Sequence, residues 1–191
     1  MSDEAPAAAV VARSATFARL LADDLGGARA ALDRARRVGA SESDCAALGA
    51  WLELKAGREP APLAADSLSL IALMLEALLR VHDFTNFESL LGLLTRLPVG
   101  ERQRRELLAQ MYLRRGFLRS AGREWLTVCE QEPDAAALIG LANVALADGR
   151  VDTAATFAAH ALQLEPGNDS ARRLLEITAD AAHTAPAAAA A

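Results

Sequence analysis

The chain has 191 residues, of which 52% are hydrophobic but only 4% are aromatic, and its formal net charge is −5. A chain of this length can bury a sizeable core, so it needs neither disulfides nor a metal in order to fold. Its apolar residues are mostly alanine and leucine, which are strong helix formers, whereas β-branched and aromatic residues are scarce. This composition excludes a sheet-rich protein and predicts an all-α fold.

Both ends of the chain are low in complexity and lack large apolar residues. We expect disordered tails at 1–11 and, rich in alanine, at 182–191, because neither segment has side chains to bury. The N-terminus lacks the basic stretch of a secretion signal, and the longest apolar run, LSLIALMLEALL, is too short to span a bilayer. Cys45 and Cys129 lie within helical patterns, which favours buried thiols over a disulfide or a zinc site. A cytoplasmic location is predicted, and the preference for arginine and alanine is typical of a GC-rich bacterial genome.

Between the tails, apolar residues recur at helical spacing and are interrupted by Gly, Pro or Asp at nearly regular intervals. Two prolines in EPAPLAADS predict a break or hinge near 58–65, because a residue before proline avoids the helical conformation. The segment 65–81 is so dense in leucine that burial on nearly all sides is expected. Ten helices are predicted, at 12–24, 27–38, 43–56, 65–81, 84–97, 100–114, 117–131, 134–147, 151–164 and 168–181.

A set of small and apolar residues recurs in the second half of the chain. Two copies share intervals of 3, 9, 4, 3 and 5 residues and lie 33 residues apart, and a looser copy before them has its proline one residue early. The copies are Ala109, Tyr112, Ala121, Trp125, Val128 and Pro133, then Ala142, Ala145, Ala154, Ala158, Ala161 and Pro166, and, in the looser copy, Leu75, Leu78, Phe87, Leu91, Leu94 and Pro98. Such a period is typical of a protein built from repeated helix pairs.

The pattern resembles the tetratricopeptide repeat, a helix-turn-helix unit of about 34 residues with small residues at the helix crossing and a closing proline. The resemblance implies an all-α superhelix, a right-handed solenoid of antiparallel helix pairs with a C-terminal capping helix. Gly116 and Gly149 would end the first helix of a pair in a left-handed conformation. Degenerate repeats are expected at 12–65, a divergent repeat at 66–99, full repeats at 100–133 and 134–167, and the capping helix at 168–181.

The sequence contains no recognised catalytic motif: a Gly-rich phosphate loop, a nucleophile elbow, a zinc-protease helix and a paired-cysteine motif are all missing. His82, His160 and His183 are scattered, and a solvated histidine is the favoured interpretation of each. We therefore expect a non-enzymatic protein without a cofactor or a metal.

The resemblance also implies where a partner would bind. Tetratricopeptide proteins usually hold a peptide or a helix on the concave face, which the first helix of each pair lines. In tetratricopeptide proteins that bind a C-terminal carboxylate, lysines occupy the positions of Glu106 and Ile139. A groove of mixed apolar and polar character is therefore favoured here. The alternative is that this face is only the solvated surface of a structural array and binds no partner. The groove residues implied are Glu76, Arg80, Gln103, Glu106, Gln110, Arg114, Ile139 and Asn143.

Positive charge is concentrated between residues 96 and 124, where eight arginines outnumber three glutamates and give a net charge of +5. Such a segment would attract an acidic partner. The alternative is that these arginines are solvated side chains on helix faces, since arginine supplies nearly every cation of this chain. A nucleic acid is disfavoured because aromatic residues are not interleaved and the whole chain is acidic. The patch comprises Arg102, Arg104, Arg105, Arg115 and Arg119.

Three functions follow from these features. The first is a protein-interaction module, an adaptor or chaperone-like scaffold that binds a peptide or helix of a partner in the concave groove. The second is an accessory subunit that docks to a separately encoded enzyme through the Arg-rich segment 96–123. The third is a structural array that associates with itself through the apolar faces of its N-terminal units. None of the three involves a membrane.

Overall fold

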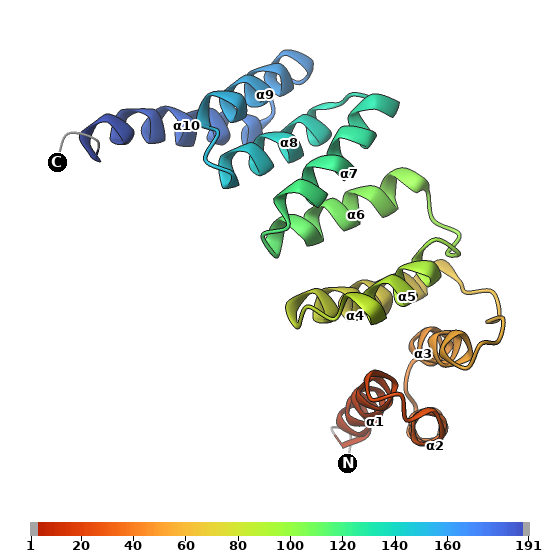
Figure 1. Ribbon diagram of the computed structural model, residues 1–191. Helices are drawn as coiled ribbons and strands as arrows, with labels where there is room; N and C mark the ends of the chain where they lie inside the picture. Colours follow the sequence, from red (N-terminus) through yellow and green to blue (C-terminus); the bar gives the residue numbers. More distant parts are fainter. Residues whose placement is uncertain (1–3, 189–191) are drawn as a thin grey trace. The chain divides into compact units, whose positions relative to one another are not determined.

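A computed structural model describes the backbone of residues 4–188 and the side chains of residues 6–183. This part of the chain is helical and contains no strand, and within each of its two units the helices pack on one another, which confirms the all-α class (Figure 1). The chain divides into two compact units, Met1–Val99 and Gly100–Ala191. No described helix combines the length and the apolar character that crossing a bilayer requires.

Residues 4–99, the described part of the first unit, form five α-helices and one short 3-10 turn. Its elements are α1 (Glu4–Leu21), α2 (Leu25–Arg37), α3 (Glu42–Lys55), η1 (Ala65–Ser67), α4 (Leu68–Arg80) and α5 (Phe84–Leu94). Helix α1 packs along α2, α3 contacts α1, α2 and α5, and α4 packs on α5 (Figure 1). No helix forms between residues 58 and 64, which confirms the predicted break.

Trp51 of α3 lies at the centre of this unit and is fully buried. Its ring centroid is 5.7 Å from that of Phe17 in α1, and its indole Nε1 donates to Ser89 Oγ of α5 at 3.3 Å. Lys55 lies 5.4 Å above the Trp51 ring, forms an ion pair with Asp23 at 2.7 Å and donates to Asn86 Oδ1 at 2.6 Å. These contacts join the α1–α2 turn, α3 and α5.

Residues 100–188, the described part of the second unit, form a consecutive stack of five helices. They are α6 (Glu101–Arg114), α7 (Leu118–Gln131), α8 (Ala135–Ala147), α9 (Val151–Leu164) and α10 (Asp169–Ala188). Each helix packs on the next, and α8 also contacts α6 and α10. The alanines of the repeated pattern are fully buried, as expected for small residues at helix crossings: Ala109, Ala121, Ala142, Ala154, Ala158 and Ala161.

Helices α7 and α8 of the second unit approach each other closely at Gly140. Trp125 is 4% exposed and packs with Val128, Leu141 and other apolar residues of α6, α7 and α8. Its indole ring lies directly on Gly140, where an added Cβ would be 2.3 Å from two ring carbons. A side chain of any size at this position would therefore collide with the largest group in the core.

The turns inside the helix pairs use residues with positive φ. Gly116 and Gly149 have φ of 77° and 74°, which confirms the left-handed ends predicted for α6 and α8. The next N–H donates to a carbonyl five residues back, from Phe117 to Tyr112 and from Arg150 to Ala145, each at 2.9 Å. In the first unit, Asp23 and His82 take the equivalent conformation. An aspartate follows each of these two residues and caps the next helix.

The helix ends differ from the sequence predictions at both termini. Helix α1 begins at Glu4 rather than at residue 12, and α10 continues to Ala188 rather than ending at residue 181, so both helices extend into the segments for which tails are predicted. Residues 1–3 and 189–191 lie outside the described part of the chain. Alanine is the strongest helix former, so an alanine-rich segment extends an existing helix without any side chain to bury.

Two internal helices also differ from the prediction. The predicted helix 65–81 starts as the turn η1 and becomes α-helical only at Leu68, and the predicted helix 84–97 ends at Leu94. The expectation that 65–81 is buried on nearly all sides is wrong, because the side chain of Leu73 is 58% exposed. Helix α4 therefore presents an apolar residue to the solvent.

Candidate functional site

Three helices of the first unit enclose an apolar pocket, here named the α1–α3–α4 pocket. Its volume is about 190 Å³. Helix α1 supplies polar and aromatic groups, α3 supplies one leucine, and α4 supplies most of the apolar wall. The lining residues are Arg13, Ser14, Phe17, Leu48, Leu70, Leu73, Met74 and Ala77.

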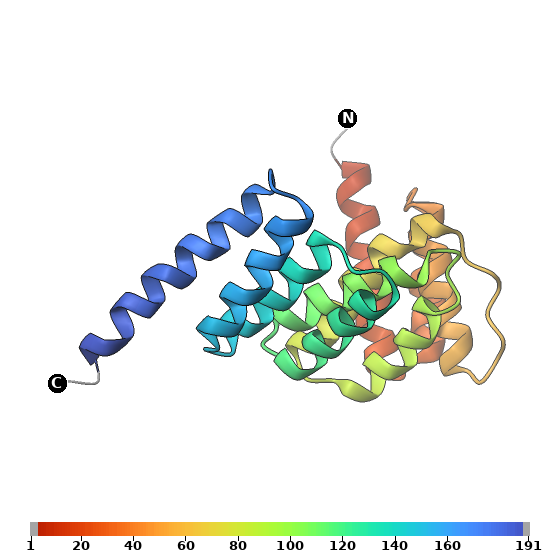
Figure 2. The same cartoon turned by 90° about the horizontal axis from the view of Figure 1, so that it is seen from above.

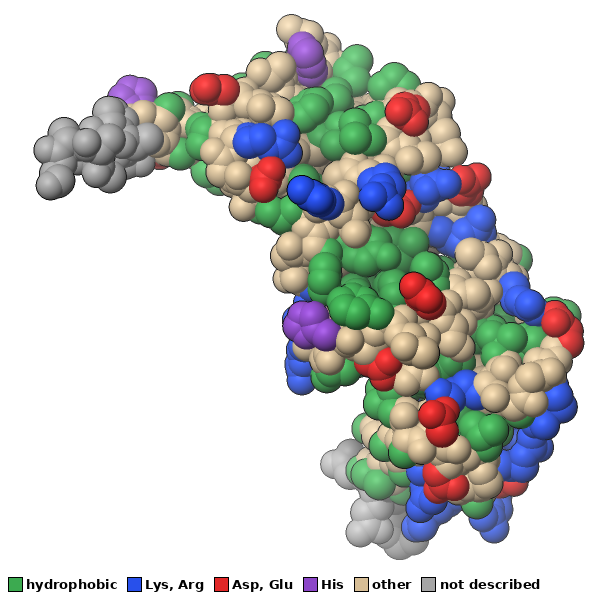
Figure 3. Space-filling model, viewed as in Figure 1, with side chains coloured by type: hydrophobic (Ala, Val, Ile, Leu, Met, Phe, Trp, Pro, Cys, Tyr) green, Lys and Arg blue, Asp and Glu red, His purple; other side chains and the backbone are tan. Residues whose placement is uncertain are grey.

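The wall supplied by α4 follows from its helical spacing. Leu70, Leu73 or Met74, and Ala77 follow one another at intervals of three or four residues, so they lie on one face of the helix. Leu70 and Met74 are buried, whereas Leu73 is 58% exposed and forms the open side of the pocket. Hydrophobic side chains gather on the surface over α4 and α5 (Figure 3). A large exposed leucine beside an apolar pocket is a feature that binding surfaces share.

The rim of the pocket is polar but electrically balanced. Arg13 Nη1 of α1 lies 2.5 Å from Asp44 Oδ2 in the first turn of α3, and both side chains are partly exposed. This ion pair holds α1 against α3 beside the opening. Because the one cationic group in the lining is already neutralised, the pocket is suited to a neutral apolar group rather than to a carboxylate.

The groove residues predicted on α4 lie close in sequence to this pocket. Glu76 is half-buried and Arg80 is exposed, and they follow Leu73 by three and seven residues on the same helix. The contributions of Leu73 and Phe17 were not predicted from the sequence. In the sequence, Leu73 is indistinguishable from the core leucines around it, and α1 lies outside the repeated pattern. The sequence therefore offers little indication that either residue lines a pocket.

The groove residues predicted on the second unit are only partly gathered on one surface. Gln103 and Gln110 are exposed on α6, and Glu106 between them accepts a hydrogen bond from Arg102 Nε at 2.8 Å. Arg114 is exposed in the last turn of the same helix. The spacing of 103, 106 and 110 places these three residues along one stripe of α6.

On α8 the two predicted groove residues differ in their surroundings. Asn143 is half-buried. Ile139 packs against buried alanines of α8, α9 and α10, such as Ala161 and Ala171. Ile139 therefore holds α8 to the helices that follow it, and Asn143 is the polar member of the predicted groove on α8.

Two members of the predicted basic patch form ion pairs within the second unit. Arg105 pairs with Glu101 at 2.7 Å and with Glu124 of α7 at 3.0 Å. Hydrogen bonds from Arg105 are the main reason that the pKa of Glu101 lies below its ordinary value. Arg102 pairs with Glu106 and Asp134 and donates to the Glu132 carbonyl at 3.1 Å. Arg104 and Arg115 are half-buried, and Arg119 is exposed.

The contacts of Arg102 predict a structural role that can be tested by substitution. Arg102→Met keeps most of the aliphatic side chain but removes the contacts with Asp134, which caps α8, and with the carbonyl of Glu132. We expect a loss of about 1 kcal/mol in the free energy of unfolding, since these groups are partly exposed to solvent. Urea unfolding measures the loss. Arg119→Met is the matched control, and an equal effect of both substitutions would contradict this role.

Among the described residues, no group of three or more His, Cys, Asp or Glu side chains could hold a metal ion. Cys45 is buried, Cys129 is half-buried, and both thiols are free. Burial is the main reason that the pKa of each thiol is raised. No protein-family model, no curated protein and no solved structure matches this chain. Its function is therefore argued from its own pattern and geometry.

Proposed function

We propose that this chain is a non-enzymatic helical-repeat module of the tetratricopeptide type, which binds a partner protein through an apolar side chain inserted into the α1–α3–α4 pocket. The single observation that carries the proposal is Leu73, 58% exposed at the open side of an apolar pocket. An engineered apolar cavity of about 150 Å³ takes up benzene. A pocket of about 190 Å³ therefore has room for one ring-sized or branched side chain.

The position of the pocket supports a repeat-type interaction. In the repeat scheme expected from the sequence, α4 is the first helix of the divergent repeat 66–99, and first helices line the face that such proteins use. The partner segment is a helix or an extended peptide with one leucine-like or aromatic anchor. The exposed guanidinium of Arg80 on α4 would meet one flank of that segment.

The arginine-rich segment is a weaker candidate for the docking surface. Arg102 and Arg105 already satisfy acidic partners on their own unit, so they would have to break ion pairs in order to bind an acidic protein. Docking of the partner on this segment is the alternative result that the crosslinking experiment below can give.

Photo-crosslinking from the pocket tests the proposal. A photoreactive phenylalanine analogue in place of Leu73 should capture a specific protein, whereas the same analogue in place of Glu88, which is exposed on α5, should not. In a pulldown without a crosslinker, capture of the same protein by Leu73→Glu should fall at least tenfold, because a carboxylate would have to be desolvated in the apolar site. Ser69→Glu, one turn earlier on the exposed side of α4, is the matched control and should keep full capture.

Two results would contradict the proposal. Equal crosslinking from positions 73 and 88 would show that the pocket is not the contact surface. Capture that survives Leu73→Glu but is lost in Arg104→Glu/Arg105→Glu would move the docking surface to the arginine-rich segment. Leu73 is mostly exposed, so its substitution leaves the core of the unit intact.

A further inference from the structure

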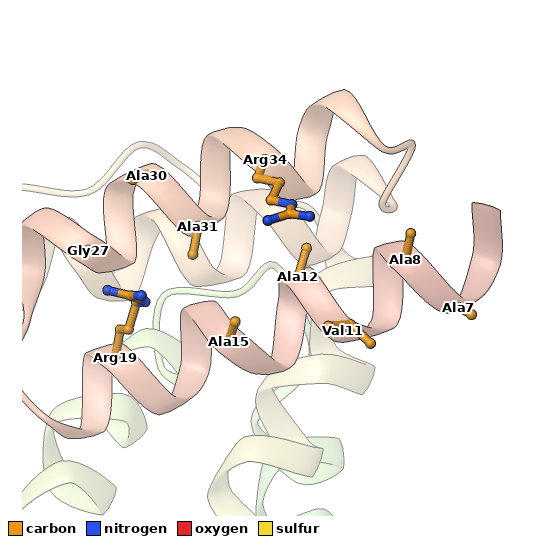
Figure 4. A pocket seen from close by; sticks show the side chains of 10 residues that line it. All are labelled: Ala7, Ala8, Val11, Ala12, Ala15, Arg19, Gly27, Ala30, Ala31 and Arg34. Atoms are coloured by element: carbon orange, nitrogen blue, oxygen red, sulfur yellow. The ribbon is translucent and has the colours of Figure 1, made fainter. Parts of the chain in front are cut away.

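A second and larger groove lies between α1 and α2 in the first unit. Its volume is about 490 Å³, and it follows α1 from Ala7 to Arg19. Figure 4 shows alanines of both helices along the groove, with the side chains of Arg19 and Arg34 reaching into it from opposite helices. Val11, which also lines it, is 68% exposed. The groove is therefore apolar along its length and cationic at two points.

The two arginines of this groove are not equivalent. Arg19 Nη1 forms an ion pair with Asp24 at 2.8 Å. Arg34 is exposed, and no ion pair or hydrogen bond of its side chain is found among the described residues. It belongs to the last turn of α2, where basic side chains gather on the surface (Figure 3). A segment that binds the groove would thus gain from a carboxylate placed near Arg34.

The second unit carries a segment with the complementary properties. Helix α10 is fixed to its unit by Ala171, Leu174 and Thr178, and no described side chain after Thr178 is buried. The helix nevertheless continues to Ala188 and projects away from α8 and α9 (Figure 2). We name residues 179–188 the α10 arm. Just before the arm, Ile177 is 50% exposed.

The arm and the groove match in length, size and charge. Ten helical residues span about 15 Å, and the thirteen residues of α1 along the groove span about 20 Å. The arm is rich in alanine, and small residues on facing helices allow close approach of the backbones. Glu176 and Asp180, one turn apart on α10, supply negative charge, whereas the groove presents Arg19 and Arg34. Apolar contact and charge therefore favour the same pairing.

We propose that the α10 arm of a second copy of this chain docks in the α1–α2 groove. The contact is head-to-tail, because the arm and the groove are different surfaces. Such a contact repeats from copy to copy and generates rings or open filaments rather than a two-fold dimer. The proposal is independent of the proposed partner pocket, which lies on the other side of α1 and uses Ser14 and Phe17.

Sedimentation velocity over a range of protein concentrations tests this assembly. The average mass of the full chain should rise above the monomer mass of 20.1 kDa as concentration increases. A chain ending at Thr178 keeps every buried residue of α10 but lacks the arm, and its self-association constant should fall at least tenfold. A mass that stays at 20.1 kDa at all concentrations, or association that survives the truncation, would overturn the proposal.

A charge exchange identifies the pairing itself. Arg34→Glu should weaken association at least tenfold through the groove, and Asp180→Arg should weaken it equally through the arm. A mixture of these two variants should associate like the wild type, because each arm then finds a groove of opposite charge. Arg37→Glu is the matched control, since Arg37 is exposed on α2 but does not line the groove, and it should leave association unchanged. Failure of the mixture to associate would overturn the pairing of arm and groove.

Discussion

Replacing Gly140 by alanine is expected to destabilise the second unit by about 1–3 kcal/mol, the usual penalty for overpacking a core. A loss of stability is unusual for this substitution, because alanine is favoured over glycine by about 1 kcal/mol inside an exposed helix. Here the added Cβ would lie 2.3 Å from carbons of the buried Trp125 ring, so α7 and α8 would have to separate. Urea unfolding followed by circular dichroism measures the change in the free energy of unfolding.

Two further variants isolate the cause of this effect. Gly122→Ala is the matched control, because Gly122 lies inside α7 and its Cβ would be 3.6 Å from Val144, which is an ordinary contact. It should be neutral or stabilising. In a Trp125→Leu background the penalty of Gly140→Ala should largely disappear, since the colliding ring is gone. Equal penalties in both backgrounds would show that the collision does not determine the effect.

Replacing Trp51 by alanine is expected to have the largest effect in the first unit, about 3–5 kcal/mol, as for other large-to-small core substitutions. Trp51 is fully buried and contacts Phe17, Ser89 and Lys55, so its loss removes packing between three helices. Trp51→Phe keeps an aromatic ring and loses the hydrogen bond to Ser89, so a smaller penalty is expected.

Hydrogen exchange read by mass spectrometry localises the effect of Trp51→Ala. Peptides from α1, α3 and α5 should lose protection, whereas peptides from the second unit, which has its own core around Trp125, should keep it. A uniform loss over residues 4–188 would show that the two units unfold as one body. A penalty below about 1 kcal/mol would contradict the central role of Trp51.

The helix pairs of the second half could be predicted because their sequence repeats a packing rule. Ala109, Ala121 and Ala154 are buried where helices meet, and Gly116 and Gly149 take the left-handed turn that only glycine adopts without strain. These features depend on local spacing, which a single sequence displays. The assignment to a named repeat family remains a prediction.

The candidate pockets could not be predicted because they depend on which helices meet. Leu73 and Leu75 are alike in the sequence, yet Leu75 is fully buried and Leu73 is 58% exposed, since only the packing of α4 against α5 decides the direction of each. The ends of α1 and α10 were missed for a different reason. Low complexity without apolar bulk resembles disorder, but long runs of alanine also sustain a helix once it has begun.

The surroundings of Lys55 have a consequence for chemical modification of the chain. It is the only lysine, and its side chain is 10% exposed between Asp23 and Asn86. A folded molecule therefore offers acylating reagents almost no lysine amine. Acylation of Lys55 would accordingly report the opening of the first unit rather than its folded surface.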